Sequence, residues 1–405
     1  MKLLHTFERR SAMLYNYFIE ESLGAQDIKL KEYEFDGKKF SIEVELPRKE
    51  HKCPVCGEQT DRIHDYRKQR IKAGEINGYF LELLYRKRRY RCERCSKNFY
   101  ESNDFVGRYQ RMTKMMVMSL LEMLKGTESF TSIAKRMNLT RPTVARLFRL
   151  TSWGKMKELP TVLGIDEFRG NANGQKFQVI LTDPDKHEVL DILPKRAEDY
   201  LLEYFLSFPK EKREEVKFFV SDMYKPYAEI AKKCFPKAIY LVDRFHWVRQ
   251  QIWAFENVRK REQKRLGKNH RLYFKRSRQL LLKHFSELDD EQKQTVLNIL
   301  SLSDDLSTAY YYKERLYALW DEPDIKKKKK SFVQITDAMK QSGISELERC
   351  ANTYYNWLPQ ILTSLEYSFS NGYTEGCNNK IKVLKRNGYG YRNFEVFRKR
   401  ILNAF

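Results

Sequence analysis

The chain has 405 residues, with 77 Lys and Arg against 54 Asp and Glu, which gives a formal net charge of +23. This length predicts two or three domains, and the 41% apolar content excludes a wholly disordered chain. No apolar run is long enough to span a membrane, and the first residues lack a secretory signal, so we expect no membrane partner and a cytoplasmic location.

The positive charge is unevenly distributed along the chain. Residues 51–160 carry an excess of 13 positive charges, residues 161–250 are neutral, and residues 251–405 carry an excess of 11. A chain that only needed solubility would not require this pattern. We expect a polyanionic partner, most simply nucleic acid, held by the two basic regions.

Four of the seven cysteines form two Cys-x-x-Cys pairs: Cys53, Cys56, Cys92 and Cys95. Four thiolates at this spacing predict a closed, tetrahedral and structural Zn²⁺ site in a reducing compartment. The alternative is two unrelated pairs of buried cysteines.

The interval between the two cysteine pairs is strand-like, which predicts a ribbon with long arms over residues 51–110. Residues 1–50 indicate only a small, strand-rich lead-in. Arg86, Arg88 and Arg89 on the ribbon arm are expected to contact phosphates, and a solvated face is the alternative.

Residues 111–158 are predicted to form three helices, the last two as a helix-turn-helix. Apolar residues recur at helical spacing after Phe130, a turn follows at residues 138–139, and Thr140 is suited to cap the last helix. Exposed residues of that last helix would enter a DNA major groove. They are Arg141, Thr143, Arg146 and Arg149. An ordinary helical hairpin is the alternative.

After Pro160 the pattern changes to strands alternating with helices. Strands are predicted at residues 162–168, 177–181, 188–193, 216–222 and 238–243. Three antiparallel strands followed by alternating helix and strand indicate a mixed α/β sheet.

Two aspartates in these strands are candidate metal ligands. Asp166 lies inside an apolar strand, where a carboxylate is costly unless it is paired or binds a metal, and Asp222 ends another strand. Asp243 also ends a strand and is the alternative to Asp222. His246 is expected to be a buried, hydrogen-bonded side chain, and Asp191 a strand-edge acid.

A helix beginning near Thr374 carries the third candidate acid, Glu375. Asn379, Lys382 and Arg386 share its face, whereas Cys377, Ile381 and Leu384 form the opposite, apolar stripe. We expect this face to place an acid at a metal site while its amide and cations follow DNA phosphates. An ordinary amphipathic helix is the alternative.

Four motifs together resemble the DDE insertion-sequence transposases, most closely their ISL-three group. These are Ile165-Asp-Glu-Phe168, Val220-Ser-Asp-Met-Tyr224, Val242-Asp-Arg-Phe-His246 and Glu375-Gly-Cys-Asn-Asn-Lys-Ile-Lys382. They occur in the family's order and the resemblance covers almost the whole chain.

The resemblance implies a multidomain α+β protein: a zinc ribbon, a helix-turn-helix, and a ribonuclease-H-like mixed α/β core interrupted by an all-helical insertion. The core would occupy residues 159–250 and 366–405, and the insertion residues 251–365. The first and fourth strands would be neighbours, which would bring Asp166 and Asp222 together, with Glu375 arriving after the insertion. The basic stretch at residues 259–265 belongs to this charged, helical insertion, whose rim is expected to contact transposon ends or a second protomer. Lys326–Lys330 are expected in a solvated loop.

The function so implied is DNA strand cleavage and strand transfer at terminal inverted repeats. Asp166, Asp222 and Glu375 would hold two Mg²⁺ ions, with Mn²⁺ as a substitute. The protein would act on double-stranded transposon-end and target DNA as at least a dimer, in association with the nucleoid. A non-catalytic repressor, a domesticated remnant, and a nuclease or resolvase on the same core are the alternatives.

Overall fold

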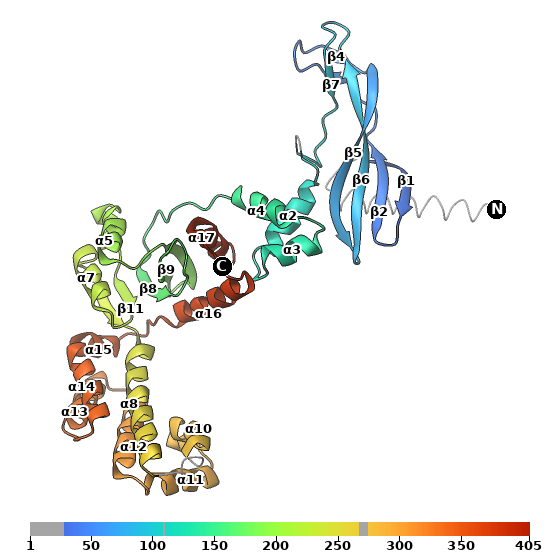
Figure 1. Cartoon of the computed structure of the whole chain (residues 1–405). Helices are drawn as coiled ribbons and strands as arrows, with labels where there is room; N and C mark the ends of the chain where they lie inside the picture. The colour runs from blue at the N-terminus through green and yellow to red at the C-terminus, as the bar shows by residue number, and fades with distance from the viewer. Residues whose placement is uncertain (1–27, 108–109, 267–273) are drawn as a thin grey trace. The chain divides into compact units, whose positions relative to one another are not determined.

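A computed structural model describes residues 28–107, 110–266 and 274–405 (Figure 1). The chain divides into two compact units. One consists of Met1–Trp153, Val383–Tyr389 and Ala404, and the other of Gly154–Lys382, Gly390–Asn403 and Phe405. Among the described residues, no helix is both long and apolar enough to cross a membrane.

The first unit contains a five-stranded sheet in the order β1-β2-β6-β5, with β7 paired to β6, and a separate β3-β4 pair. Its strands are β1 (Lys29–Phe35), β2 (Lys39–Glu45), β3 (His51–Lys52), β4 (Gln59–Thr60), β5 (Ile63–Ile76), β6 (Tyr79–Arg91) and β7 (Asn98–Tyr100).

The long hairpin of β5 and β6 is the predicted ribbon with long arms. Asn77 and Gly78 make its two-residue turn, both with positive φ (52° and 87°), as a tight hairpin turn requires. The described residues before position 51 are strand-rich, as predicted, but they do not form a separate lead-in. Strands β1 and β2 extend the sheet of the ribbon, because β2 pairs in parallel with β6 and its apolar side chains complete one core.

Three helices follow: α2 (Lys114–Met123), α3 (Phe130–Arg136) and α4 (Arg141–Arg149). The hydroxyls of Thr113 and Ser129 accept backbone N–H bonds and cap α2 and α3. Thr140 lies at the cap of α4 as predicted, but its hydroxyl bonds the Thr143 hydroxyl (2.9 Å) instead of the backbone. The predicted apolar stripes of α3 and α4 are buried, which confirms the helical pair.

The second unit is built on a five-stranded sheet in the order β10-β9-β8-β11-β12. Antiparallel pairing joins β8, β9 and β10, and parallel pairing joins β8, β11 and β12. The first and fourth strands are therefore neighbours, as the resemblance implied. The strands are β8 (Val162–Phe168), β9 (Gln178–Asp183), β10 (Glu188–Leu193), β11 (Phe218–Ser221) and β12 (Ile239–Val242).

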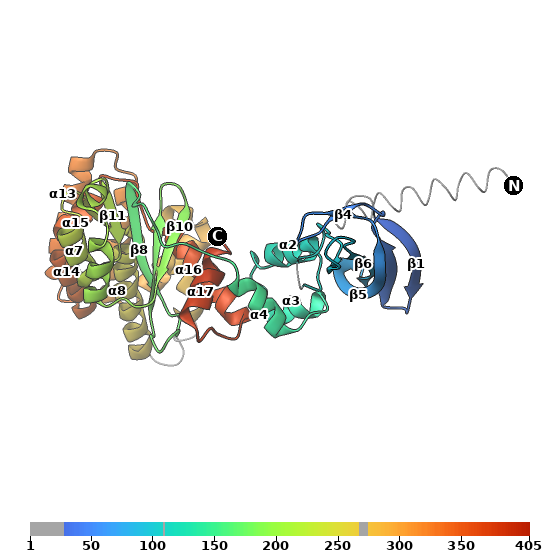
Figure 2. The same cartoon turned by 90° about the horizontal axis from the view of Figure 1, so that it is seen from above.

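Helices cover both faces of this sheet (Figures 1 and 2). Helices α5 (Glu198–Leu206) and α7 (Lys225–Cys234) pack on Leu163 and Ile165 of β8. The short α6 (Lys210–Glu214) precedes β11. On the opposite face lie α16 (Gly372–Asn387) and α17 (Phe394–Leu402), where the Phe397 ring meets the Phe168 ring. Alternate residues of β8 therefore face α5 and α7 or face α16 and α17.

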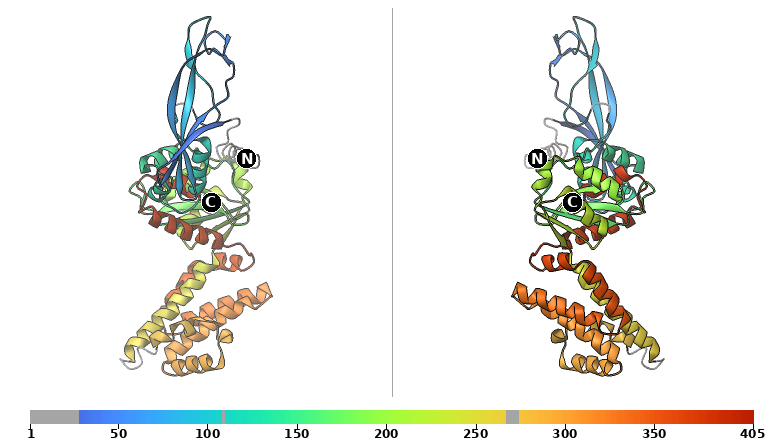
Figure 3. Two further views of the ribbon diagram at one scale, coloured as in Figure 1. Left: turned by 90° about the vertical axis from the view of Figure 1, so that its right-hand side faces the viewer. Right: turned by 90° about the vertical axis from the view of Figure 1, so that its left-hand side faces the viewer.

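The helical insertion has a core of its own. Its elements are α8 (Arg244–Arg265), α10 (Arg278–Leu282), η1 (Phe285–Glu287), α11 (Asp290–Leu300), α12 (Asp304–Tyr317), η2 (Ala318–Trp320), α13 (Ile325–Lys340), α14 (Ser345–Asn356) and α15 (Leu358–Ser364). In Figure 3 the yellow α8 runs from the core into the orange helices of the insertion.

Two features of the helical insertion differ from the prediction: its first residue and the conformation of Lys326–Lys330. It begins within α8 at Arg244, directly after β12, and α15 packs back on β12, where the Ser364 hydroxyl accepts from the Val242 amide (2.8 Å). Lys326–Lys330 lie in the first turns of α13 and not in a loop. The Asp324 carboxylate caps that helix and favours helical geometry there.

Candidate active site and zinc centre

Three aspartates lie at one level of three adjacent parallel strands. Val220 of β11 pairs with Gly164 of β8. Asp222 and Asp166 each lie two residues beyond this pair, and the charge of Asp166 contributes to the raised pKa of Asp222. The pairing of Ser221 with Val242 likewise places Asp243 beside Asp222, and the Asp243 amide donates to the Ser221 carbonyl (2.7 Å). Because parallel neighbours in register face the same side of the sheet, the three carboxylates lie together at the carboxyl ends of these strands. We call Asp166, Asp222 and Asp243 the acidic edge.

Asp166 is held at both carboxylate oxygens. The Glu167 amide donates to its Oδ1 (2.7 Å), and the Asn378 side-chain amide of α16 donates to its Oδ2 (2.8 Å). Burial raises the pKa of Asp166 to about 7, and the charges of Glu167, Asp243 and Glu375 add to that shift. A carboxylate so placed binds a cation readily once it loses its proton.

Asp222 lies in a similar electrostatic environment. Burial raises its pKa to about 7, with Asp166, Glu167 and Asp243 contributing and Arg196 opposing. Its Oδ1 atom is buried and has no hydrogen-bond partner among the described residues. An anionic oxygen without a donor is costly, so this oxygen is suited to a metal ligand.

Glu167 is the half-buried acid beside this edge, and it is neutralised by Arg196. The Arg196 guanidinium donates to Glu167 Oε1 (2.5 Å) and lies over the Phe177 ring. Within this pair Glu167 raises the pKa of Asp222 and Arg196 lowers it by a smaller amount.

Asp243 has more structural partners than its two neighbours. It is 2% exposed, and its Oδ1 accepts from the Asn371 amide (3.1 Å). Its Oδ2 lies 3.8 Å from His246 Nε2. Burial raises the pKa of Asp243, and burial lowers the pKa of the half-buried His246. Asp243 therefore connects the start of α8 with the start of α16.

The start of α16 is anchored on the sheet by hydrogen bonds. The Asn371 side-chain amide donates to the Ile165 carbonyl (3.0 Å), and the Thr374 and Thr182 hydroxyls share a buried hydrogen bond (2.7 Å). Gly164 permits this close approach, because a Cβ there would lie 2.5 Å from Thr182 Oγ1 and 3.0 Å from Asn371 Oδ1.

This anchoring places Glu375 in the first turn of α16, half-buried, where its charge acts on both Asp166 and Asp243. The predicted apolar stripe of this helix is buried: Cys377, Ile381 and Leu384. Asn379, Lys382 and Arg386 are exposed, as expected for the opposite face.

The four cysteines come together at the end of the ribbon. Their sulfur atoms all lie within 4.8 Å of one another, and no other group of three or more candidate ligands among the described residues is so close. The carboxylates of the acidic edge are thus further apart than the thiols. The sulfur atoms of Cys53 and Cys95, and those of Cys56 and Cys92, are 3.5 Å apart. Tetrahedral Zn–S bonds of ~2.3 Å place sulfurs about 3.8 Å apart, so the group fits zinc.

Both cysteine pairs are held in the same backbone turn. The Gly57 amide donates to the Cys53 carbonyl and the Ser96 amide donates to the Cys92 carbonyl, each at 3.0 Å. Gly57 and Ser96 both have positive φ (75° and 57°). The backbone amide of Cys56 lowers the pKa of Cys53 to about 6, whereas the pKa values of Cys56 and Cys95 are raised, with the neighbouring thiols contributing. A bound metal ion would be needed to hold all four as thiolates.

The candidate DNA contacts of α4 are accessible. Arg141, Arg146 and Arg149 are exposed, and Thr143 is half-buried. On the ribbon, Arg86 is partly exposed with its guanidinium over the Tyr66 ring, and Arg89 lies 3.4 Å from Asp65. All six positions except Thr143 thus present positive charge at a surface.

Two polar side chains are more buried than the sequence indicated. Arg88 is 5% exposed and donates to the Leu46 carbonyl and to Glu101, so the prediction that it contacts phosphates is wrong. Asp191 lies on β10, an outer strand of its sheet, as predicted, but it is 2% exposed and accepts from Arg398 of α17 (2.6 Å).

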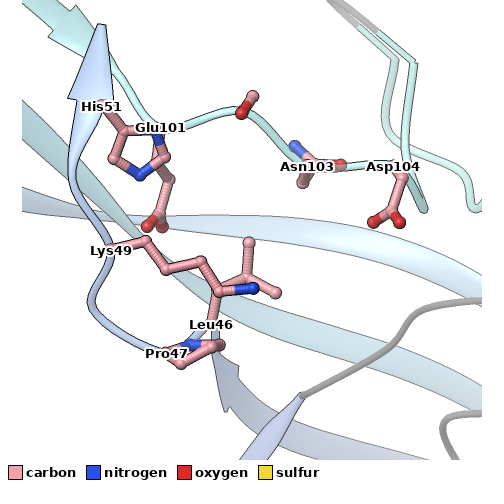
Figure 4. Close-up of a pocket in the computed structure, with 8 residues that line it drawn as sticks. Leu46, Pro47, Lys49, His51, Glu101, Asn103 and Asp104 are labelled. Atoms are coloured by element: carbon pink, nitrogen blue, oxygen red, sulfur yellow. The ribbon is translucent and has the colours of Figure 1, made fainter.

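A polar pocket in the first unit is distinct from the acidic edge (Figure 4). Its only fully buried carboxylate, Glu101, also accepts from Tyr85 (2.7 Å) and from the Arg88 amide (2.9 Å). That carboxylate is already satisfied, so the pocket carries no catalytic assignment. Its lining is Leu46, Pro47, Lys49, His51, Glu101, Ser102, Asn103 and Asp104.

Comparison with known proteins agrees with this domain order. Residues 163–401 match a transposase model of the ISL3 type that carries the DDE designation. The chain belongs to the ISL3 family of transposases. Residues 49–95 match the zinc finger of the transposases IS204, IS1001, IS1096 and IS1165, and residues 101–150 match the helix-turn-helix domain of the ISL3 family.

Two curated relatives differ in how much of the chain they cover. The transposase for insertion sequence element IS1001 of Bordetella parapertussis is 28% identical over 380 residues, covering 91% of this chain and 92% of that protein. A Lactococcus lactis protein described as an ATP-dependent protease is 35% identical over 133 residues, covering 32% of this chain and 37% of its own length. The first likeness extends through all the modules of this transposase.

Sequence reasoning missed three residues that build the site. Asn378 was passed over because helical periodicity places it between the charged and apolar faces of α16. Asn371 and Gly164 carry no charge, and their roles depend on contacts between distant segments. The adjacent Asn378-Asn379 pair beside Glu375 was the one signal available in the sequence.

Proposed function

We propose that this transposase binds the terminal inverted repeats of its element and cuts and joins DNA through Asp166, Asp222 and Glu375. The observation that carries the proposal is the register of β8 and β11, which sets Asp166 beside Asp222, with α16 anchored over the same edge. Between the two aspartates that end strands we assign Asp222 and not Asp243, because Asp222 Oδ1 is buried without a partner among the described residues, whereas Asp243 Oδ1 accepts from the Asn371 amide and its Oδ2 lies 3.8 Å from His246.

The carboxylates at this edge suit Mg²⁺, or Mn²⁺ in its place. Hard divalent cations prefer oxygen ligands, and Asp222 Oδ1 is a buried oxygen without a donor. The pKa values of Asp166 and Asp222 are raised first by burial and then by neighbouring carboxylates, and a bound cation would offset both effects. When bound, two such ions supply activation of a water or 3′-hydroxyl and stabilisation of the leaving oxygen.

The chain's own residues would orient these groups and the DNA. Asn378 fixes one oxygen of Asp166, and the anchored turn at Asn371 fixes the direction of Glu375. Exposed Asn379, Lys382 and Arg386 would then contact the phosphate backbone beside the cut.

The front modules would supply recognition of the transposon ends. Helix α4 would enter the major groove with Arg141, Thr143, Arg146 and Arg149, while Arg86 and Arg89 contact phosphates. Pairing of two ends requires at least a dimer on DNA, in association with the nucleoid in the cytoplasm.

The test is cleavage and joining of transposon-end DNA with Mg²⁺. We expect the wild type to cut and Asp166→Asn to bind the same DNA without cutting it. Asp290→Asn, at an exposed position of α11, is the matched control and should cut normally. Normal cleavage by Asp166→Asn would contradict the assignment.

The same assay separates the alternatives. A wild-type protein that binds end DNA tightly and never cuts it would indicate a repressor or a remnant. Cleavage without joining of pre-cut ends would indicate a nuclease.

A further inference from the structure

One exposed line of side chains runs along α8 from its first turn to its last. Its members recur every three or four residues, as one helix face requires. We call it the α8 stripe: Phe245, Arg249, Trp253, Asn257, Lys260 and Lys264. At ~1.5 Å rise per residue it extends about 28 Å.

The α8 stripe contains no acid, although α8 has two. Glu256 and Glu262 are 5% and 3% exposed, and both are ion-paired. Glu256 pairs with Arg259 and Glu262 with Arg265. The buried Arg259 is therefore not the rim contact expected from the sequence. The outward face of α8 is left with cations, an amide and two aromatic rings, which complements a polyanion.

The two aromatic side chains of the α8 stripe are unusually accessible. Phe245 is 44% exposed and Trp253 is 46% exposed. The Arg249 guanidinium lies between them, 4.3 Å from the Trp253 ring centroid and 5.7 Å from that of Phe245. Cation–π contact holds the three side chains in one row without covering the rings.

The α8 stripe begins at the acidic edge. Phe245 is two residues beyond Asp243, the residue that precedes α8 and shares the level of Asp166 and Asp222. Its ring meets the His246 ring edge-on, with centroids 5.7 Å apart. A DNA strand leaving the carboxylates along α8 would meet Phe245 first, then Arg249, then Trp253.

We propose that the α8 stripe binds unpaired nucleotides of the DNA strand next to the cut, with bases stacked on Phe245 and Trp253 and phosphates contacted by Arg249, Lys260 and Lys264. Alternating rings and cations suit single strands, because unpaired bases expose their faces and duplex bases do not. This inference rests on the proposed function, since it assigns a DNA segment to the same site.

The test compares two DNA probes that differ only in an unpaired flank. One is a blunt duplex and the other is the same duplex with a single-stranded thymidine overhang. Affinity is measured without Mg²⁺, so that cleavage does not intervene. We expect Trp253→Ala to weaken binding of the overhang probe about tenfold and binding of the blunt probe much less.

Two further variants distinguish stacking from charge and from folding. Trp253→Phe keeps a ring and should restore most of the overhang affinity. Lys264→Ala removes a phosphate contact and should weaken binding of the overhang probe in a salt-dependent way. Because both positions are exposed, neither change removes a core contact.

Equal effects of Trp253→Ala on the two probes, or none on either, would overturn the inference. So would a change in oligomeric state with DNA affinity intact, which would make the α8 stripe a protein interface. A wild type that binds neither probe would instead contradict the proposed function, and this inference with it.

Discussion

Asn378 of α16 donates its side-chain N–H to Asp166 Oδ2 at 2.8 Å and thereby joins α16 to β8, the first strand of the core. Asn378 is 4% exposed, and its own Oδ1 is buried with no partner among the described residues. The amide nitrogen of Asn378 therefore binds Asp166, while its oxygen accepts no hydrogen bond from the described residues.

Asn378→Ala should lower the rate of strand cleavage about 10- to 100-fold, the effect typical of losing a residue that orients a metal ligand. The Mg²⁺ concentration for half-maximal cleavage should rise as well, because Asp166 loses its fixed orientation. Asn298→Ala, at an exposed position of α11, is the control. Unchanged Mg²⁺ dependence would show that Asn378 only packs.

Gly164→Ala should impair cleavage without touching an acid. Its Cβ would lie 2.5 Å from Thr182 Oγ1 and 2.8 Å from Pro184 Cγ, which forces the start of α16 away from β8. We expect a loss of about 1–3 kcal/mol in stability together with reduced cleavage. Thermal unfolding and the cleavage assay measure the two effects. Gly154→Ala, where a Cβ would meet nothing within 4 Å, should change neither.

Asp222→Asn should abolish cleavage and raise thermal stability in the absence of Mg²⁺. The folded-state pKa of Asp222 is raised to about 7, so the fold favours the protonated acid and is destabilised as the pH rises through that range. The stability gained by the variant should therefore grow from about pH 4, near the ordinary pKa of 3.8, to about pH 7 and level off above it. A gain that shrinks with rising pH would contradict the raised pKa. Unfolding midpoints of both proteins over this range provide the measurement.

Cys92→Ser should release the zinc that four thiolates hold. We expect about one zinc per chain in the wild type, measured by elemental analysis in reducing buffer. The variant should lose it together with the stability of the ribbon end, because metal binding is coupled to folding there. Cys234→Ser, in the core between α7 and the sheet, should retain its zinc. Full zinc content in Cys92→Ser would rule out the four-cysteine site.

Arg146→Ala should weaken binding of duplex DNA and reduce its dependence on salt. If Arg146 contacts a phosphate, the slope of log affinity against log salt should fall by about 1. If it contacts a base, affinity should fall only for the recognised sequence. Arg136→Ala is the matched control, because Arg136 of α3 is exposed but paired with Glu128 at 2.7 Å. Equal losses from both variants would argue against α4 as the recognition helix.

Local patterns were sufficient to predict most elements and their order. The strand at residues 162–168 and the strand at residues 188–193 were predicted with the observed bounds, because each is a short, mostly apolar run with turn signals beside it. The cysteine pairs were recognisable for the same reason, since two thiols three positions apart already point at one ion.

Relations between distant segments required the folded chain. The burial of Arg88 depends on Glu101, the residue that follows β7, and the burial of Asp191 depends on Arg398, more than two hundred residues later. No local periodicity encodes such a partner. The sequence alone therefore identified which acids have a costly position within strands, because the cost arises from their immediate neighbours. Only the tertiary structure decided that Asp166, Asp222 and Asp243 lie side by side on neighbouring strands. It also decided that Asn378 holds Asp166 and that Gly164 must lack a side chain. Each of these relations depends on the register and packing of segments that only folding brings together.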